Sequence, residues 1–138
     1  MKGVLVDTCI WSIALRRKYP DDLSIAEALT ELIYAGNAKI IGPIRQELLS
    51  GYSDVKQYEK LRDKLTFFPN EIILDVDYVL AAAFSNSCRQ QGIQGSHIDF
   101  LICAVADRVG MPIFTQDKDF EYYSKIIPIS LYQPLNLH

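Results

Sequence analysis

Four acidic residues stand where their carboxylates could hold a cation. Asp7 directly follows a short apolar run near the N-terminus, and Asp117 comes two residues after another such run, "PIFT". Ligands of open parallel α/β sheets bind beyond the carboxyl ends of the strands, so both acids are expected at that edge. Glu47 and Asp99 lie within apolar helical stretches, where a solvated carboxylate is not expected.

Each of these acids also has a structural interpretation. Asp7 could cap a helix, and Glu47 could be an exposed residue of a short helix. Asp99 follows Ser96 at the spacing of a capping box, and Asp117 could close a turn. Taken one at a time, the structural interpretations are favoured. Taken together, the four positions favour an acidic cluster on one edge of the sheet.

Such a cluster has a physical requirement. Carboxylates within a few ångströms of one another raise each other's pKa, so the cluster is unfavourable unless a cation sits in it. The sequence offers no obvious ion-pair partner for these acids, with Arg45 and Lys118 as the exceptions to test. Carboxylate oxygens suit Mg²⁺ or Mn²⁺, whereas zinc prefers Cys and His. The chain has only two histidines and three widely spaced cysteines.

A divalent metal held by carboxylates is suited to cleaving phosphodiesters, because it activates a bound water and stabilises the leaving oxygen. No Ser-His-Asp or Cys-His arrangement offers an alternative nucleophile. The net charge of −3 argues against binding nucleic acid by overall charge. Local phosphate contacts could come from residues 15–20 or from the basic face of 54–65, which could equally be solvated surface.

The spacing of apolar residues predicts the strands and helices that would position these acids. Short apolar runs alternate with helical patterns, which predicts parallel β-α-β units with helices on both faces of one sheet. Strands are expected at 3–6, 38–41 and 112–115, with further short ones within 67–74 and at 127–131. Helices are expected at 9–17, 24–37, 43–51, 54–65, 75–91, 96–110 and 118–124, and Ser24 with Glu27 predicts a capping box. The fold class is therefore α/β, in a single domain covering 1–138.

The ordered motifs resemble those of the PIN-domain ribonucleases, and among them the VapC-type toxins of toxin–antitoxin pairs. The matching segments are "VDTCIW", "IRQELLSG", "HIDFLICAVA" and "IFTQDKDF". They occur in the family's order and spacing, and the likeness covers essentially the whole chain. Cys9 departs from the Ser or other small residue that is more usual in the family.

The resemblance implies a Mg²⁺-dependent endoribonuclease, in which Mn²⁺ can substitute. By this resemblance, Asp7, Glu47, Asp99 and Asp117 are catalytic metal ligands and Asp119 is an auxiliary ligand. Thr8 and Thr115 would supply hydroxyls that support the ligands. The partners that it implies are an RNA substrate, a small cognate antitoxin and a second copy of the chain in a homodimer.

Two classes of alternative remain. A haloacid-dehalogenase-like phosphatase would need a second Asp where Cys9 stands, and a receiver domain would need a Lys at the end of its last strand. A PIN-like protein could also be a silent binding module, or a nuclease outside a toxin–antitoxin pair. No segment has the pattern of a signal peptide or a membrane span, and the cysteines are not arranged as a disulfide framework. We therefore expect a cytoplasmic protein without membrane contacts.

Overall fold

The strands form one parallel sheet through the middle of the molecule. The computed structural model describes residues 3–16 and 19–134. Its strands are β1 (Val4–Val6), β2 (Ala38–Ile41), β3 (Asn70–Glu71) and β4 (Ile113–Phe114). They lie in the order β3-β2-β1-β4 and every neighbouring pair is parallel. The predicted α/β class and parallel sheet are confirmed.

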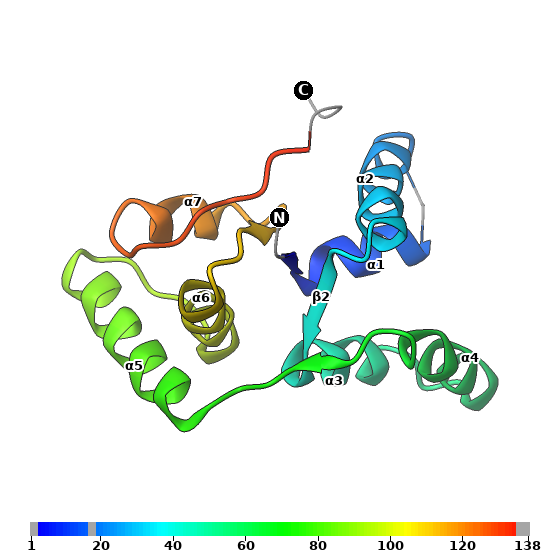
Figure 1. Cartoon of the computed structure of the whole chain (residues 1–138), viewed down its shortest axis with the longest axis horizontal. Coiled ribbons are helices and arrows are strands. Elements are labelled where there is room, and N and C mark those ends of the chain that lie inside the picture. Colours follow the sequence, from blue (N-terminus) through cyan, green and yellow to red (C-terminus); the bar gives the residue numbers. More distant parts are fainter. Residues whose placement is uncertain (1–2, 17–18, 135–138) are drawn as a thin grey trace.

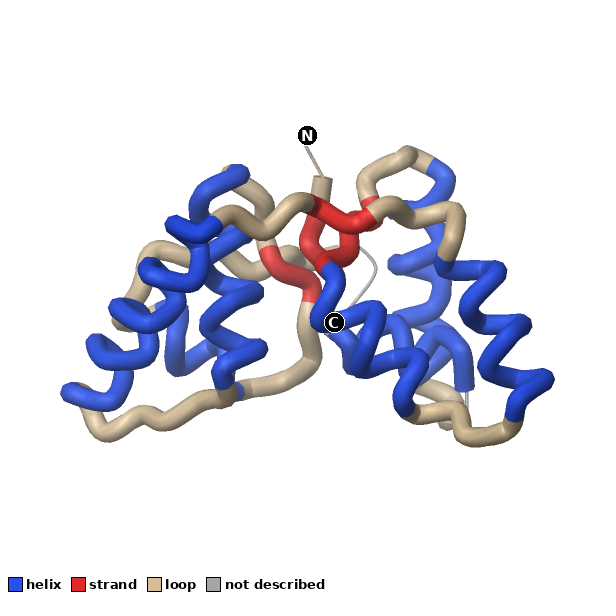
Figure 2. Tube along the Cα trace, turned by 90° about the horizontal axis from the view of Figure 1, so that it is seen from below, coloured by secondary structure: helices blue, strands red, loops and turns tan. Residues whose placement is uncertain are grey.

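Helices lie on both sides of these strands, as Figure 2 shows. Those on one side are α1 (Thr8–Arg16), α2 (Asp22–Tyr34), α3 (Gly42–Ser50) and α4 (Val55–Leu65). Those on the other are α5 (Asp75–Gln90), α6 (His97–Val109) and α7 (Asp119–Ser124), as Figure 1 shows. Because β1 lies between β2 and β4, the loops after β1 and β4 leave the sheet side by side.

The core is centred on β1 and α6. All three residues of β1 are fully buried, as are the α6 residues from Ile102 to Val105. This explains why both segments read as apolar runs rather than amphipathic patterns. Burying one such Val or Ile side chain contributes roughly 1.5–3 kcal/mol, so β1 and α6 are rigid supports for the residues at their ends.

Several helix boundaries agree with the sequence prediction. Ser96 caps α6 by accepting a hydrogen bond from the Asp99 backbone N–H at 3.1 Å. Gly110 ends the same helix in the left-handed conformation, with φ of 73°, which glycine adopts without steric cost. Pro43 lies in the first turn of α3, and Gly51 ends that helix.

Two predictions about the elements are wrong. The capping box of Ser24 and Glu27 does not form, because α2 begins two residues earlier, at Asp22. The strand expected at 127–131 is reduced to a single parallel bridge between Ile113 and Leu131, since Pro128 has no N–H to donate to a ladder. By contrast, the short strand expected within 67–74 is confirmed as the two-residue β3.

Parts of two predictions lie outside the described residues. The helix expected over 9–17 is seen to Arg16, and the basic stretch 15–20 includes residues 17–18. Within the described ranges, no helix combines the length and the apolar character that crossing a membrane requires.

Candidate metal site at the carboxyl edge of the sheet

Three acids come together beyond the end of β4. Asp99, in the first turn of α6, and Asp117 and Asp119, in the segment after β4, place carboxylate oxygens within 4.8 Å of one another. Asp99 is partly buried, whereas Asp117 and Asp119 are exposed. The Asp119 backbone N–H donates to Asp117 Oδ1 at 3.0 Å, which holds the loop in a tight turn. These acids form an open, acidic surface site.

Asp7 lies beside this group, at the end of β1. It is buried, with 8% of its surface exposed. Its Oδ1 accepts a hydrogen bond from the Thr8 backbone N–H, and its Oδ2 accepts one from the Thr115 hydroxyl, both at 2.8 Å. Hydrogen bonds therefore hold Asp7 from both sides. It contacts the first residue of α1 while facing the loop that carries Asp117.

Glu47 stands at the margin of the site. Its Oε2 accepts a hydrogen bond from the Thr8 hydroxyl at 3.3 Å, which links α3 to the start of α1. The expectation that Glu47 lies within an apolar helical face is wrong, since the neighbouring Leu48 is buried but Glu47 is exposed. Its helix turns it away from the core toward the carboxyl edge. Neither Glu47 nor Asp7 belongs to the group within 4.8 Å.

Both threonines named from the sequence contact these acids. Besides its bond to Asp7, the Thr115 Oγ1 accepts a hydrogen bond from the Asp117 backbone N–H at 3.0 Å. Thr115 therefore joins the acid after β1 to the loop after β4. Thr8, through its hydrogen bond to Glu47, connects that acid to the carboxyl edge of the sheet.

The two least exposed acids of the site have raised pKa values. Burial raises the pKa of Asp7 more than the hydrogen bonds from Thr115, Thr8 and Cys9 lower it, and the charge of Asp99 raises it further. Burial also raises the pKa of Asp99, against the hydrogen bonds from Tyr123 and Ser96, and the charges of Asp117 and Asp119 add to the increase. Burial is therefore the main cause of both shifts, and the neighbouring carboxylates add to it.

No fixed cation balances the site within residues 3–16 and 19–134, where none of the five acids forms an ion pair with Lys, Arg or His. Arg45, one of the two exceptions noted in the sequence, instead donates to Asn70 Oδ1 at 2.9 Å and to the backbone carbonyl oxygens of Leu65 and Phe68. An uncompensated group of carboxylate oxygens, open to solvent, fits a hard divalent cation such as Mg²⁺ or Mn²⁺.

Two residues of the site were missed by the sequence prediction. The Tyr123 hydroxyl donates a hydrogen bond to Asp99 Oδ2 at 2.7 Å. Its position four residues after Asp119 in a predicted helix was a usable signal, because residues at that spacing share a face. Cys9 was noted only as a departure from the family's usual residue, yet its Sγ lies 3.5 Å from Asp7 Oδ2 and accepts a hydrogen bond from the Gln116 backbone N–H at 3.4 Å. Burial, with the charge of Asp7, raises the pKa of this thiol.

Residues 4–126 match the sequence profile of the PIN domain. The chain belongs to the PIN domain family. This confirms the resemblance stated from the four motifs, and it places Asp7, Glu47, Asp99 and both acids after β4 within the matched region. No curated protein matches the chain by sequence.

Solved structures share this PIN fold at low sequence identity. FitAcB from Neisseria gonorrhoeae superposes with a TM-score of 0.77 at 19% identity, over 97% of this chain and 99% of that one. VapBC2 from Rickettsia felis, bound to a DNA fragment from its promoter, gives 0.69 at 17% identity, over 94% and 96%. A toxin–antitoxin complex from Klebsiella pneumoniae gives 0.65 at 17% identity, over 98% and 100%.

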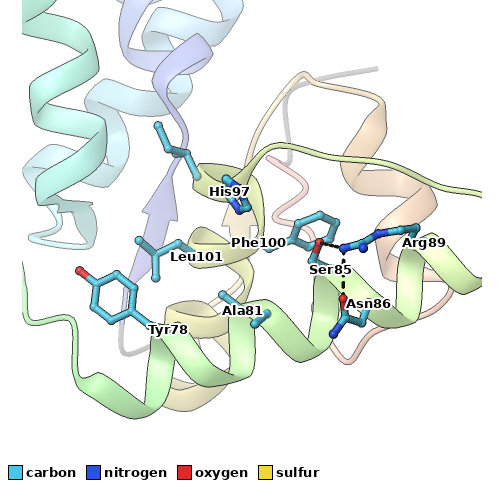
Figure 3. Close-up of a pocket in the computed structure, with 10 residues that line it drawn as sticks. Tyr78, Ala81, Ser85, Asn86, Arg89, His97, Phe100 and Leu101 are labelled. Atoms are coloured by element: carbon cyan, nitrogen blue, oxygen red, sulfur yellow. Dashed lines mark hydrogen bonds between the residues drawn. The ribbon is translucent and has the colours of Figure 1, made fainter.

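An apolar pocket opens between α5 and α6 of this PIN domain, near the start of α6. It has a volume of about 340 Å³, and Figure 3 shows α5 and α6 forming its two sides. His97, one of the residues lining it, is two positions before Asp99 and is the first residue of α6. Arg89, also on the lining, donates to Asn86 Oδ1 one turn earlier on α5 at 3.1 Å, as Figure 3 shows. The pocket is lined mostly by apolar side chains and so differs in character from the acidic edge.

Proposed function

We propose that this PIN domain is a Mg²⁺-dependent endoribonuclease, with Mn²⁺ able to substitute, and the toxin of a toxin–antitoxin pair. The observation that carries the proposal is the group formed by Asp99, Asp117 and Asp119, which has no fixed counter-cation in the described part of the chain. Asp7 and Glu47 extend this acidic edge on the side of α1 and α3. We assign the whole chain, 1–138, to one PIN domain.

The proposed roles follow from the geometry. Asp99, Asp117 and Asp119 would hold the metal, with Asp7 and Glu47 as further ligands at the edge of the site. The bound metal would activate a water for attack on the phosphodiester and neutralise charge at the leaving oxygen. Thr115 fixes the Asp7 carboxylate relative to the backbone of Asp117, because its hydroxyl forms hydrogen bonds with both.

The RNA backbone would need positive charge beyond the metal. The basic residues of α4, named from the sequence, all project to solvent: Lys56, Lys60, Arg62 and Lys64. Arg62 forms an exposed ion pair with Asp63 at 3.2 Å, so the other three offer the freer phosphate contacts. Such contacts position a nucleic acid without reading its sequence.

Protein partners are the second part of the proposal. The similar solved structures include toxin–antitoxin complexes, and we propose that this chain likewise binds a cognate antitoxin. The apolar pocket between α5 and α6 suits an apolar side chain of that partner. We also propose a homodimer, which light scattering of the purified protein would test. All three cysteines are free, which supports our proposal that the protein acts in the reducing cytoplasm.

A cleavage assay with metal control tests the catalytic proposal. Purified protein should cleave RNA in Mg²⁺ or Mn²⁺, lose the activity in excess chelator and regain it when metal is restored. RNA cleavage that persists undiminished in excess chelator would refute the metal mechanism. A metal-replete protein that cleaves no RNA, with all five acids intact, would instead support a silent binding module.

A further inference from the structure

A buried tyrosine contacts the acid that links the core to the candidate metal site. Tyr123, in α7, is fully buried, and its hydroxyl lies 2.7 Å from Asp99 Oδ2. Asp99 is the least exposed of the three clustered acids, and its neighbours Asp117 and Asp119 carry like charge. Repulsion among the three would turn Asp99 away from the group unless another contact holds its carboxylate.

The tyrosine ring cannot easily move. Phe100 lies 4.8 Å from it and Phe120 lies 5.2 Å from it, measured between ring centroids. The backbone at Gly95 closes the remaining side, because a Cβ atom there would overlap the Tyr123 hydroxyl. The hydroxyl is therefore held at one place by the core, in contrast to a donor on a flexible surface side chain.

A phenol is chemically suited to this contact. It donates one hydrogen bond and carries no charge, so Asp99 keeps its negative charge and its remaining lone pairs. An Arg or Lys in the same place would neutralise the carboxylate and compete with a metal. Hydrogen-bond partners of this kind orient metal-ligating carboxylates, and their removal typically lowers metal affinity about 10- to 100-fold.

We infer that Tyr123 is a positioning residue, whose hydroxyl holds the Asp99 carboxylate in the orientation that binds the divalent metal. The inference rests on the proposed function, since it assumes that Asp99 is a metal ligand. Gly95 belongs to the same arrangement, because it leaves the space that the hydroxyl occupies. Tyr123 itself does not touch the substrate in this account.

The test compares metal affinity in matched variants. Tyr123→Phe removes only the hydroxyl oxygen, and Gly95→Ala should displace the same hydroxyl without changing the tyrosine. Tyr122→Phe is the control, since Tyr122 is adjacent and exposed. The dissociation constant for Mn²⁺ is measured by the loss of the free-ion electron paramagnetic resonance signal. RNA cleavage is then followed as a function of Mn²⁺ concentration.

We expect Mn²⁺ to bind about tenfold more weakly to Tyr123→Phe and to Gly95→Ala, and unchanged to Tyr122→Phe. Cleavage by the two affected variants should recover at saturating Mn²⁺, because the ligands themselves remain. If the native protein binds Mn²⁺ and cleaves RNA but both variants bind it equally well, the positioning role is refuted. If the native protein neither binds Mn²⁺ nor cleaves RNA, the proposed function fails instead. Should one variant not fold, the other decides.

Discussion

A buried or partly buried aspartate lies near each end of helix α6, and the two have opposite electrostatic surroundings. Near its C-terminal end, Arg108 pairs with the fully buried Asp77 of α5, at 2.7 Å between Nε and Oδ1. Near its N-terminal end, about 13 Å along the axis, Asp99 faces Asp117 and Asp119 without any such cation. The same residue type is therefore neutralised by the protein at one end of the helix and left uncompensated at the other.

The pKa shifts run in opposite directions for that reason. At Asp77 burial raises the pKa, but the hydrogen bonds from Arg108 and from the Leu74 backbone N–H, with the charge of Arg108, bring it below its ordinary value. At Asp99 burial and the neighbouring carboxylates raise it. The comparison separates a structural acid, whose counter-charge belongs to the fold, from acids for which we propose a bound metal ion as the counter-charge.

Activity should show the largest difference between the two regions. Asp99→Asn should lower RNA cleavage by about 100-fold or more, because it removes several kcal/mol of metal-dependent stabilisation of the transition state. Asp77→Asn should leave the rate of the folded protein unchanged. Cleavage is measured in Mg²⁺ at a temperature where both variants remain folded. An Asp99→Asn protein that is as active as Asp77→Asn would remove the distinction between the two regions.

Stability should show the reverse pattern. Arg108→Leu leaves Asp77 buried and unpaired, which should cost about 3 kcal/mol of unfolding free energy in urea titrations. Adding Asp77→Leu to Arg108→Leu should restore part of the loss, because the buried charge is then gone. In metal-free buffer Asp99→Asn should leave the melting temperature unchanged or raise it, since it relieves repulsion and Asn can still accept the Tyr123 hydrogen bond. A large loss with Asp99→Asn would mean that this acid is structural.

The pH dependence of stability gives the smallest and most specific difference. Because the pKa of Asp99 is raised, the stability it contributes is present below the unfolded-state pKa of about 3.9 and is lost as the pH rises through the folded-state pKa. In metal-free buffer Asp99→Asn should therefore gain melting temperature relative to the native protein between about pH 4 and pH 7. Asp77→Asn should behave oppositely, since the lowered pKa of Asp77 gives stability that is lost only as the pH falls through it. Thermal unfolding followed by circular dichroism gives the melting temperature of each variant at each pH. The same pH dependence of melting temperature in both variants would contradict the comparison.

Much of this arrangement could be predicted from local patterns. The end of a buried strand is visible in the sequence where an apolar run meets Asp7, and the start of α6 is visible from Ser96 and the apolar stretch that follows. Parallel strands then bring the loops after β1 and β4 to the same edge by topology alone. The signals that failed were the weak ones. Pro128 left too few backbone hydrogen bonds at 127–131 to form the ladder that its apolar neighbours suggested.

The sequence by itself determined the α/β class, the parallel sheet and the set of acids at its carboxyl edge, because each depends on short-range periodicity and on where a strand or helix ends. Only the tertiary structure decided which carboxylates approach one another. It turned Asp7 toward Thr115, left Glu47 at the margin and placed Asp99 against Tyr123. It also paired Asp77 with Arg108, which are far apart in the sequence. These contacts depend on side-chain packing between distant segments, which local residue patterns do not encode.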